Sequence, residues 1–190
     1  MNLAILTPLS AIAFLVCGLL DSSVAQEKIA LDLTKPASWS ETVARSNDQL
    51  AEQTKLLIGV AKDVKRPDSE RREAIYALAK IGNRESLEYL VSNLTLKLEV
   101  GIITGDEDRL KATACVYALR EFAKDNWNVA AVIFASLDGS RSDLQLGYSA
   151  SILKRILGKK AATALIDANL TADLKPNHKS NLLGLKRALD

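Results

Sequence analysis

Histidine and cysteine, the side chains that most often bind metals or act as nucleophiles, are scarce in this chain of 190 residues. His178 is the one histidine, and Cys17 and Cys115 are the two cysteines. A zinc site needs several such ligands, and a Ser-His-Asp centre would need His178 beside a nucleophile. No Gly-x-Ser-x-Gly turn is present. We therefore expect His178 to be a solvated residue at the start of the last helix and Cys115 to be a buried apolar residue.

The densest acidic cluster is Gly105-Asp106-Glu107-Asp108. It lacks the regularly spaced oxygen ligands of a calcium loop. Carboxylates at the beginning of a helix stabilise the helix because they oppose the positive end of its dipole. We expect a helix to start near Asp108, so the cluster predicts a helix start. Together, these residues predict no catalytic residue, no metal site and no cofactor.

Residues 1–25 differ from the rest of the chain. They contain no Lys or Arg, carry an apolar run over residues 11–20, and end in Ser23-Val24-Ala25. The run and the small residues at its end are typical of a secretory signal peptide, and they predict cleavage near Ala25 and export to the periplasm or the cell exterior. Two alternatives stay open: the segment is kept as a membrane anchor, or Cys17 is a lipoprotein cysteine.

The composition is that of a folded chain, with 48% hydrophobic and 25% charged residues. Removal of residues 1–25 would take away Asp21 and Cys17, which leaves a net charge of +3 and one cysteine. A charge this small argues against a nucleic-acid partner, because such partners are bound through many basic contacts. A single cysteine excludes an intramolecular disulfide.

Apolar residues recur at helical spacing along most of the chain. A long helix is predicted from Ser40 to about Lys65, with Val64 on its apolar face. The next helix is predicted to end at Gly82, because glycine favours the left-handed conformation that follows many helices. Asn83 can cap the helix after it. Residues 72–94 therefore predict an antiparallel helical hairpin.

An arm of residues 26–39 precedes these helices. Its segment 29–33 alternates between apolar and polar residues, which is typical of a strand. Two interpretations remain open: an extended arm that lies along the helices, or a strand donated to a partner's sheet.

The hairpin recurs along the chain. Ile75-Tyr76-Ala77-Leu78 is answered 41 residues later by Val116-Tyr117-Ala118-Leu119, with Phe122 in the place of Ile81. Recurrence of a helical pattern at such a period is typical of solenoids, in which each repeat packs on its neighbours.

A fainter third copy follows. Asn93-Leu94-Thr95 reappears 76 residues later as Asn169-Leu170-Thr171. Both triplets match the N-glycosylation sequon, and helix termination explains them equally well. A last amphipathic helix is predicted from about Asn177. The sequence thus predicts an all-α fold, an α-α superhelix of about three hairpins with flanking helices over residues 40–190.

The first copy carries a family resemblance. Residues 72–82, with Arg, Ala, Ala-Leu and Ile-Gly in the expected places, resemble a HEAT repeat of the short type also seen in phycobilin lyases. The resemblance extends at most over residues 69–170. It implies a packing geometry and a surface that binds proteins. It does not imply lyase activity, because no lyase-specific motif accompanies it.

The resemblance also suggests where a partner would bind, since the second helices of such hairpins commonly line the concave face. The tryptophan in the turn of the second hairpin is a further candidate, because tryptophan is enriched at interface hot spots. The predicted binding residues are Arg84, Glu88, Ser92, Trp127, Asn128, Lys159, Lys160 and Asp167.

Charge is unevenly distributed along the chain. Residues 141–190 contain nine basic and four acidic residues, whereas residues 85–125 contain five basic and eight acidic ones. A basic end would steer a protein with an acidic patch, although solvated helix faces explain the same counts.

We predict an exported binding or adaptor protein without catalytic activity. The alternatives are a cofactor-handling accessory protein similar to the lyase subunits, and an envelope protein that binds an anionic polymer or lipid headgroups through its basic C-terminal third. Contact with a membrane is expected only if residues 1–25 are kept.

Overall fold

The computed structural model describes residues 31, 32, 34–44, 49–102 and 104–190, so the predicted signal peptide and its cleavage site lie outside the described residues. The described residues form helices and no strand, which confirms the all-α prediction. The helices are α1 (Trp39–Ala44), α2 (Leu50–Lys62), α3 (Asp68–Ile81), α4 (Arg84–Ser92), α5 (Asp106–Ala112), α6 (Ala114–Glu121), α7 (Asn128–Ala135), α8 (Asp143–Leu157), α9 (Lys159–Leu170) and α10 (Pro176–Leu189), with the short 3-10 helices η1 (Pro36–Ser38) and η2 (Ser136–Asp138).

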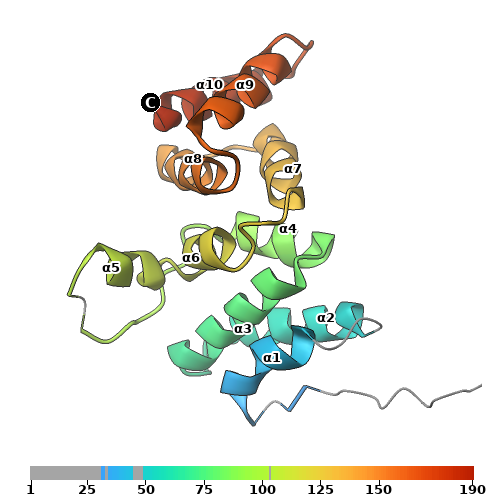
Figure 1. Ribbon diagram of the computed structural model, residues 1–190, viewed down its shortest axis with the longest axis vertical. Coiled ribbons are helices and arrows are strands. Elements are labelled where there is room, and N and C mark those ends of the chain that lie inside the picture. The colour runs from blue at the N-terminus through green and yellow to red at the C-terminus, as the bar shows by residue number, and fades with distance from the viewer. Residues whose placement is uncertain (1–30, 33, 45–48, 103) are drawn as a thin grey trace, which may run out of the picture.

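The helices stack in two rows, as expected for a solenoid (Figure 1). In one row α3 packs against α6, and α6 packs against α8. In the other row α2 contacts α4, and α4 contacts α7. α10 packs along α8 and covers the end of the stack together with α9. This arrangement confirms the predicted HEAT-like α-α superhelix. None of the described helices is both long and apolar enough to cross a bilayer.

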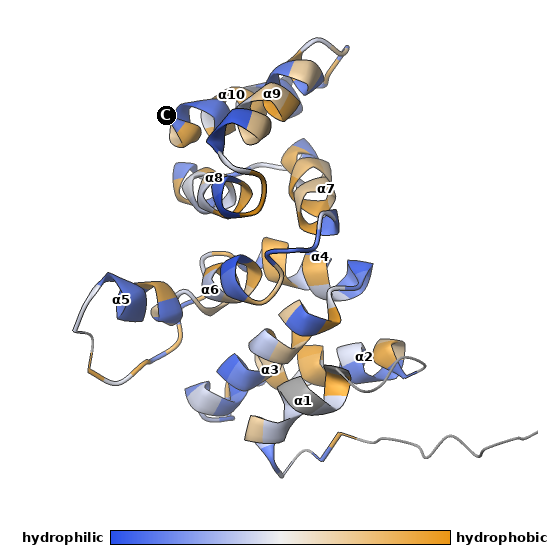
Figure 2. Cartoon of the chain, in the orientation of Figure 1, coloured by the Kyte–Doolittle hydropathy of each residue, from blue (hydrophilic) through white to orange (hydrophobic). Residues whose placement is uncertain are grey.

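The core lies between the two rows. Leu78 of α3 and Leu90 of α4 are fully buried, and so are their counterparts Leu119 of α6 and Ile133 of α7. Figure 2 shows apolar residues on the facing sides of these helices and polar residues at their ends and in the connecting turns. Burial of each such side chain contributes about 1.5–3 kcal/mol, so contacts within the hairpins and contacts between them both stabilise the solenoid.

The sequence correspondence between the first and third hairpins has a structural counterpart. The side-chain amide of Asn93 donates to the carbonyl of Tyr89 at 2.7 Å, and that of Asn169 donates to the carbonyl of Leu165 at 2.8 Å. Both asparagines therefore lie at the end of the second helix of a hairpin, and each side chain donates to the carbonyl of the residue four positions earlier.

The prediction of one long helix over residues 40–65 is wrong. α1 ends at Ala44, α2 spans Leu50–Lys62, and residues 45–48 lie outside the described residues. Asp63 has an extended backbone, and its carboxylate accepts a hydrogen bond from the backbone N–H of Lys65 at 3.0 Å. Such a local bond ends a helix early, and it leaves Val64 80% exposed on a turn instead of on an apolar face.

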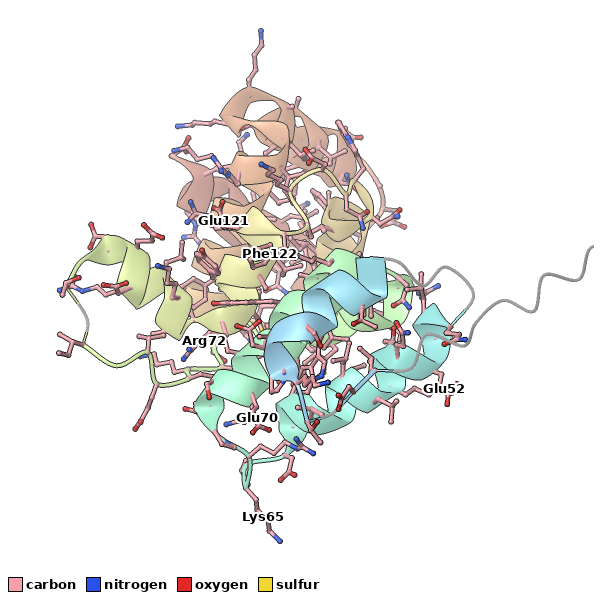
Figure 3. The ribbon with its side chains drawn as sticks, turned by 60° about the horizontal axis from the view of Figure 1, so that its bottom comes forward. Glu52, Lys65, Glu70, Arg72, Glu121 and Phe122 are labelled. Atoms are coloured by element: carbon pink, nitrogen blue, oxygen red, sulfur yellow. The ribbon has the colours of Figure 1, made fainter. Side chains whose placement is uncertain are left out.

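The second hairpin also departs from the prediction. The helix expected from Asp108 is divided at Thr113 into α5 and α6, and the Thr113 hydroxyl donates to the carbonyl of Leu110 at 2.8 Å. Phe122, expected to replace Ile81 in the core, is 36% exposed. Its ring instead lies against the surface, 5.0 Å from the ring of Tyr76 and 6.0 Å from that of Tyr117 (Figure 3).

The described part of the N-terminal arm is fixed to the solenoid by Trp39. This side chain is fully buried, and its indole N–H donates to the carbonyl of Asp32 at 2.8 Å. Leu31 packs against the core, and η1 connects it to α1. Ile29, Ala30 and Leu33 of the predicted strand segment lie outside the described residues.

Candidate functional site

A groove of about 790 Å³ lies between α4 and α7, the second helices of the first two hairpins. Four of the predicted binding residues line it: Arg84, Glu88 and Ser92 from α4, and Asn128 from α7. They come together because α4 and α7 pack side by side, so residues 36 or more positions apart in the sequence face one space.

The two turns before these helices set their relative position. Gly82 ends α3 with a backbone φ of 60°, and the side chain of Asn83 caps α4 by accepting from the N–H of Ser86 at 2.9 Å. The side-chain amide of Asn126, in the equivalent turn of the next hairpin, donates to the carbonyl of Gly82 at 2.9 Å. This bond joins the two turns and places the beginnings of α4 and α7 next to each other.

The floor of the groove is apolar and its side chains are small. Val91 of α4 is buried, whereas Ala131, Val132 and Ala135 of α7 are partly or fully exposed. Valine and alanine at these positions leave the space between the helices open. Bulky residues there would fill it.

Two polar side chains that face this floor have no partner in the described protein. Neither the hydroxyl of Ser92 nor the side-chain amide of Asn128 forms a hydrogen bond with any described residue. Arg84 and Glu88, by contrast, form an ion pair at 2.7 Å, with side chains that are 88% and 52% exposed. An exposed pair of this kind contributes little to stability. Because Arg84 and Glu88 bind each other, the side chains of Ser92 and Asn128 remain available to a ligand.

Arg141 is a groove residue that the sequence did not single out, except as one of many basic residues in the last third. It follows η2 and lines the groove beside Ser136, at the end of α7. Its Nε donates to the carbonyl of Ser136 at 3.0 Å. Burial lowers the pKa of the Arg141 guanidinium from its ordinary value, because part of its hydration is lost.

The remaining predicted residues lie outside the groove. Trp127 is adjacent to Asn128 and 71% exposed, but its side chain is not part of the lining. Lys159, Lys160 and Asp167 lie on α9, around a separate shallow surface beside the C-terminal residue Asp190.

Internal ion pairs reduce the charge of that second surface. Lys159 lies 3.5 Å from the carboxylate of Asp190, and Lys186 lies 2.6 Å from that of Asp167. Lys160 forms no ion pair with the described residues. Only part of the excess positive charge in the last third of the sequence is therefore unpaired in the folded protein.

His178 differs from the expectation of a solvated residue. Its side chain is only 13% exposed, and its Nδ1 lies 2.6 Å from Oδ1 of Asp138. Lys175 lies 3.2 Å from the other oxygen of the same carboxylate. His178 thus fastens the beginning of α10 to η2, a contact across 40 residues that no local sequence signal could reveal.

Cys115 is not placed in the described structure as an exposed nucleophile. Cys115 is fully buried, as predicted, and burial raises the pKa of its thiol to about 12, so the thiolate nucleophile is not populated at neutral pH. Within the described residues, no group of three or more His, Cys, Asp or Glu side chains is arranged to hold a metal ion.

Comparison with known proteins agrees with this architecture. Residues 70–95 match the family model described as PBS lyase HEAT-like repeat. This range covers most of α3, all of α4 and the turn between them, and it confirms the resemblance of residues 72–82. No curated protein and no solved structure gave a significant match to the chain. The chain is thus a helical repeat protein whose residues 70–95 are similar to a PBS lyase HEAT-like repeat.

Proposed function

We propose that this chain is an exported, non-catalytic binding protein that holds a segment of another protein in the groove between α4 and α7. The observation that carries the proposal is the groove itself, which combines unpaired polar groups with an apolar floor. HEAT-like repeats commonly serve as protein-interaction modules, which supports the same class of function.

The dimensions of the groove suit a short extended segment. α4 and α7 contain nine and eight residues, so each is about 12–14 Å long. An extended chain rises about 3.3 Å per residue, so about four residues would lie along the groove. Apolar side chains of such a segment would bury themselves against Val91 and Val132, while Ser92 and Asn128 would bind its backbone.

Export is a separate part of the proposal, and it is supported by the sequence of residues 1–25 alone. If the segment is cleaved near Ala25, the partner resides in the periplasm or outside the cell. Sequencing the N-terminus of the protein isolated from its native cells tests this part independently. A chain that begins at Gln26 is the expected result, and a chain that retains residues 1–25 would contradict it.

The groove is tested with a variant that fills it. Ala131→Trp places a large ring on the floor from an exposed position of α7. Ala168→Trp is a matched control, because Ala168 is also exposed and helical but lies on α9, outside the groove. Each variant would carry a C-terminal tag and be used for cross-linked affinity capture from native cells, after circular dichroism has shown native helix content.

We expect the wild type and Ala168→Trp to retain the same stoichiometric protein partner. Ala131→Trp is expected to lose up to nine-tenths of it, since a lost binding contribution of about 1.4 kcal/mol weakens the affinity about tenfold. Retention of the partner by Ala131→Trp, or its loss only in Ala168→Trp, would contradict the groove as the binding site.

A further inference from the structure

The charge of the groove is concentrated on one residue. Arg84 and Glu88 neutralise each other at 2.7 Å. Arg141 is the remaining charged side chain of the lining, and it gives the groove a net charge of +1. A guanidinium carries five N–H donors, and the bond to the Ser136 carbonyl occupies only the one at Nε. No other hydrogen bond and no ion pair connects Arg141 to the described residues.

Two of the other partly buried arginines are matched by carboxylates, whereas Arg72 donates to the backbone carbonyl of Glu99 and forms no ion pair with the described residues. Arg66 lies 2.8 Å from Glu70, and Arg71 lies 2.9 Å from Asp68. Figure 3 shows Glu70 on α3 above the turn that carries Lys65, which points away from the body of the protein. Pairing of this kind compensates a guanidinium for the hydration that it loses on burial.

Arg120 is the most informative comparison, because it too forms no ion pair with the described residues and its Nε has no hydrogen-bond partner there. The hollow that it lines also contains three carboxylates, those of Asp106, Glu107 and Glu121, which give its lining a net charge of −2. Each of these carboxylates also lies within 3.5 Å of a further cation outside the lining, so the charge of the lining as a whole, and not a single pair, distinguishes this hollow from the groove. The groove beside Arg141 contains only Glu88, whose carboxylate is already held by Arg84. Among the described residues that line this groove, Arg141 therefore has no unpaired carboxylate beside it.

We propose that Arg141 binds a carboxylate, and that the segment held in the groove carries an aspartate or a glutamate at the end nearest η2. This inference rests on the proposed function. The free donors at the two Nη atoms form a fork that matches the two oxygens of a carboxylate. One positive charge over a floor of valine and alanine suits a single carboxylate within an apolar segment. A phosphate, with close to two negative charges, would need further cations.

The preference of the groove for an acidic residue is tested with a displayed library of random heptapeptides, selected on the immobilised full-length chain. In parallel, the library is selected on Arg141→Gln, which removes the charge, and on Arg141→Lys, which keeps the charge but not the fork. Lys160→Gln is the matched control, because it removes an unpaired positive charge from the α9 surface. Thermal unfolding of each variant is measured beside the selection.

We expect peptides selected on the wild type to share an Asp or Glu at one position, next to apolar positions. Replacing that residue by Asn or Gln in a selected peptide should weaken binding to the wild-type chain about tenfold, which corresponds to about 1.4 kcal/mol. The same replacement should change binding to Arg141→Gln by less than twofold, while Lys160→Gln should behave as the wild type. Arg141→Lys should lie between the two.

The outcomes separate this inference from the proposed function. If peptides are selected without a shared acidic position, or if Lys160→Gln and not Arg141→Gln abolishes the preference, Arg141 is not the carboxylate-binding residue, although the groove still binds peptides. If Ala131→Trp selects the same peptides as the wild type, the groove is not the binding site. If Arg141→Gln does not fold, the peptides in which Asn or Gln replaces the acidic residue still test the inference. If such a peptide binds the wild-type chain as tightly as the original peptide, the inference is overturned.

Discussion

The turn between α3 and α4 gives the sharpest test of how the hairpins are held together. Gly82 has a φ of 60°, a left-handed conformation that costs other residues about 1–2 kcal/mol. A Cβ atom on this residue would lie 2.5 Å from the side-chain nitrogen of Asn126. Asn126 would therefore have to move, and its hydrogen bond to the Gly82 carbonyl contributes about 1 kcal/mol. We expect Gly82→Ala to lower the free energy of unfolding by about 2–3 kcal/mol.

The assay is urea unfolding followed by circular dichroism, supported by the melting temperature. For a chain of this size, the expected loss corresponds to a melting temperature about 5–10 °C lower. Gly147→Ala is the matched control, because Gly147 lies in α8 with no atom within 4 Å of the added Cβ. It should stabilise the protein by about 0.5–1 kcal/mol, since alanine favours a helix over glycine.

A second variant separates the two contributions to the Gly82 effect. In an Asn126→Ala background the close contact and the hydrogen bond are both absent, so Gly82→Ala should cost only the conformational part of about 1–2 kcal/mol. If Gly82→Ala is as stable as the wild type, or if it responds like Gly147→Ala, the role assigned to this turn is wrong.

Two further predictions concern groups whose pKa is shifted. The hydrogen bond from His178 and, next, that from Lys175 hold the pKa of Asp138 below its usual value. The Asp138 carboxylate therefore stabilises the fold above about pH 4. This contribution disappears as the pH falls through the lowered pKa of the folded state. The wild type should therefore melt above Asp138→Asn at pH 6 and converge with it near pH 2, and an equal difference at both values would refute the pairing. Burial raises the pKa of Cys115 to about 12, so its thiol should react with iodoacetamide only in denaturant, and rapid labelling of the native protein at pH 7.5 would show that Cys115 is accessible.

The first hairpin could be predicted closely because its signals are local. Gly82 follows the last turn of a helix with one apolar side, and Asn83 stands where an N-cap is needed. The structure confirms both roles, with a left-handed Gly82 and a bond from the Ser86 N–H to Asn83. Burial of Cys115 followed in the same way from its neighbours in the repeat.

Other features depend on contacts that no short window of sequence contains. The position of Phe122 at the surface depends on its contacts with the rings of Tyr76 on α3 and Tyr117 on α6. His178 was expected in solvent because its partner Asp138 lies 40 residues earlier.

The same limit applied to the candidate site. Residues on α4 and the start of α7 could be proposed from the repeat, and they do line one groove. Arg141 could not be assigned to it, because a loop residue after a 3-10 helix has no helical period that fixes its direction. The grouping of Lys159, Lys160 and Asp167 with the other predicted residues also depended on the repeat alone, and these three lie on a different surface.

The most direct test of the groove as the binding site is site-specific photo-crosslinking in the native cells. Benzoylphenylalanine would replace Trp127, which is 71% exposed next to Asn128 of the groove, or Leu165, which is 38% exposed on α9. We predict that a protein partner is captured from position 127 and not from position 165, and that its cross-linked peptide contains an aspartate or a glutamate. Capture from position 165 and not from position 127 would contradict the account and move the interface to α9.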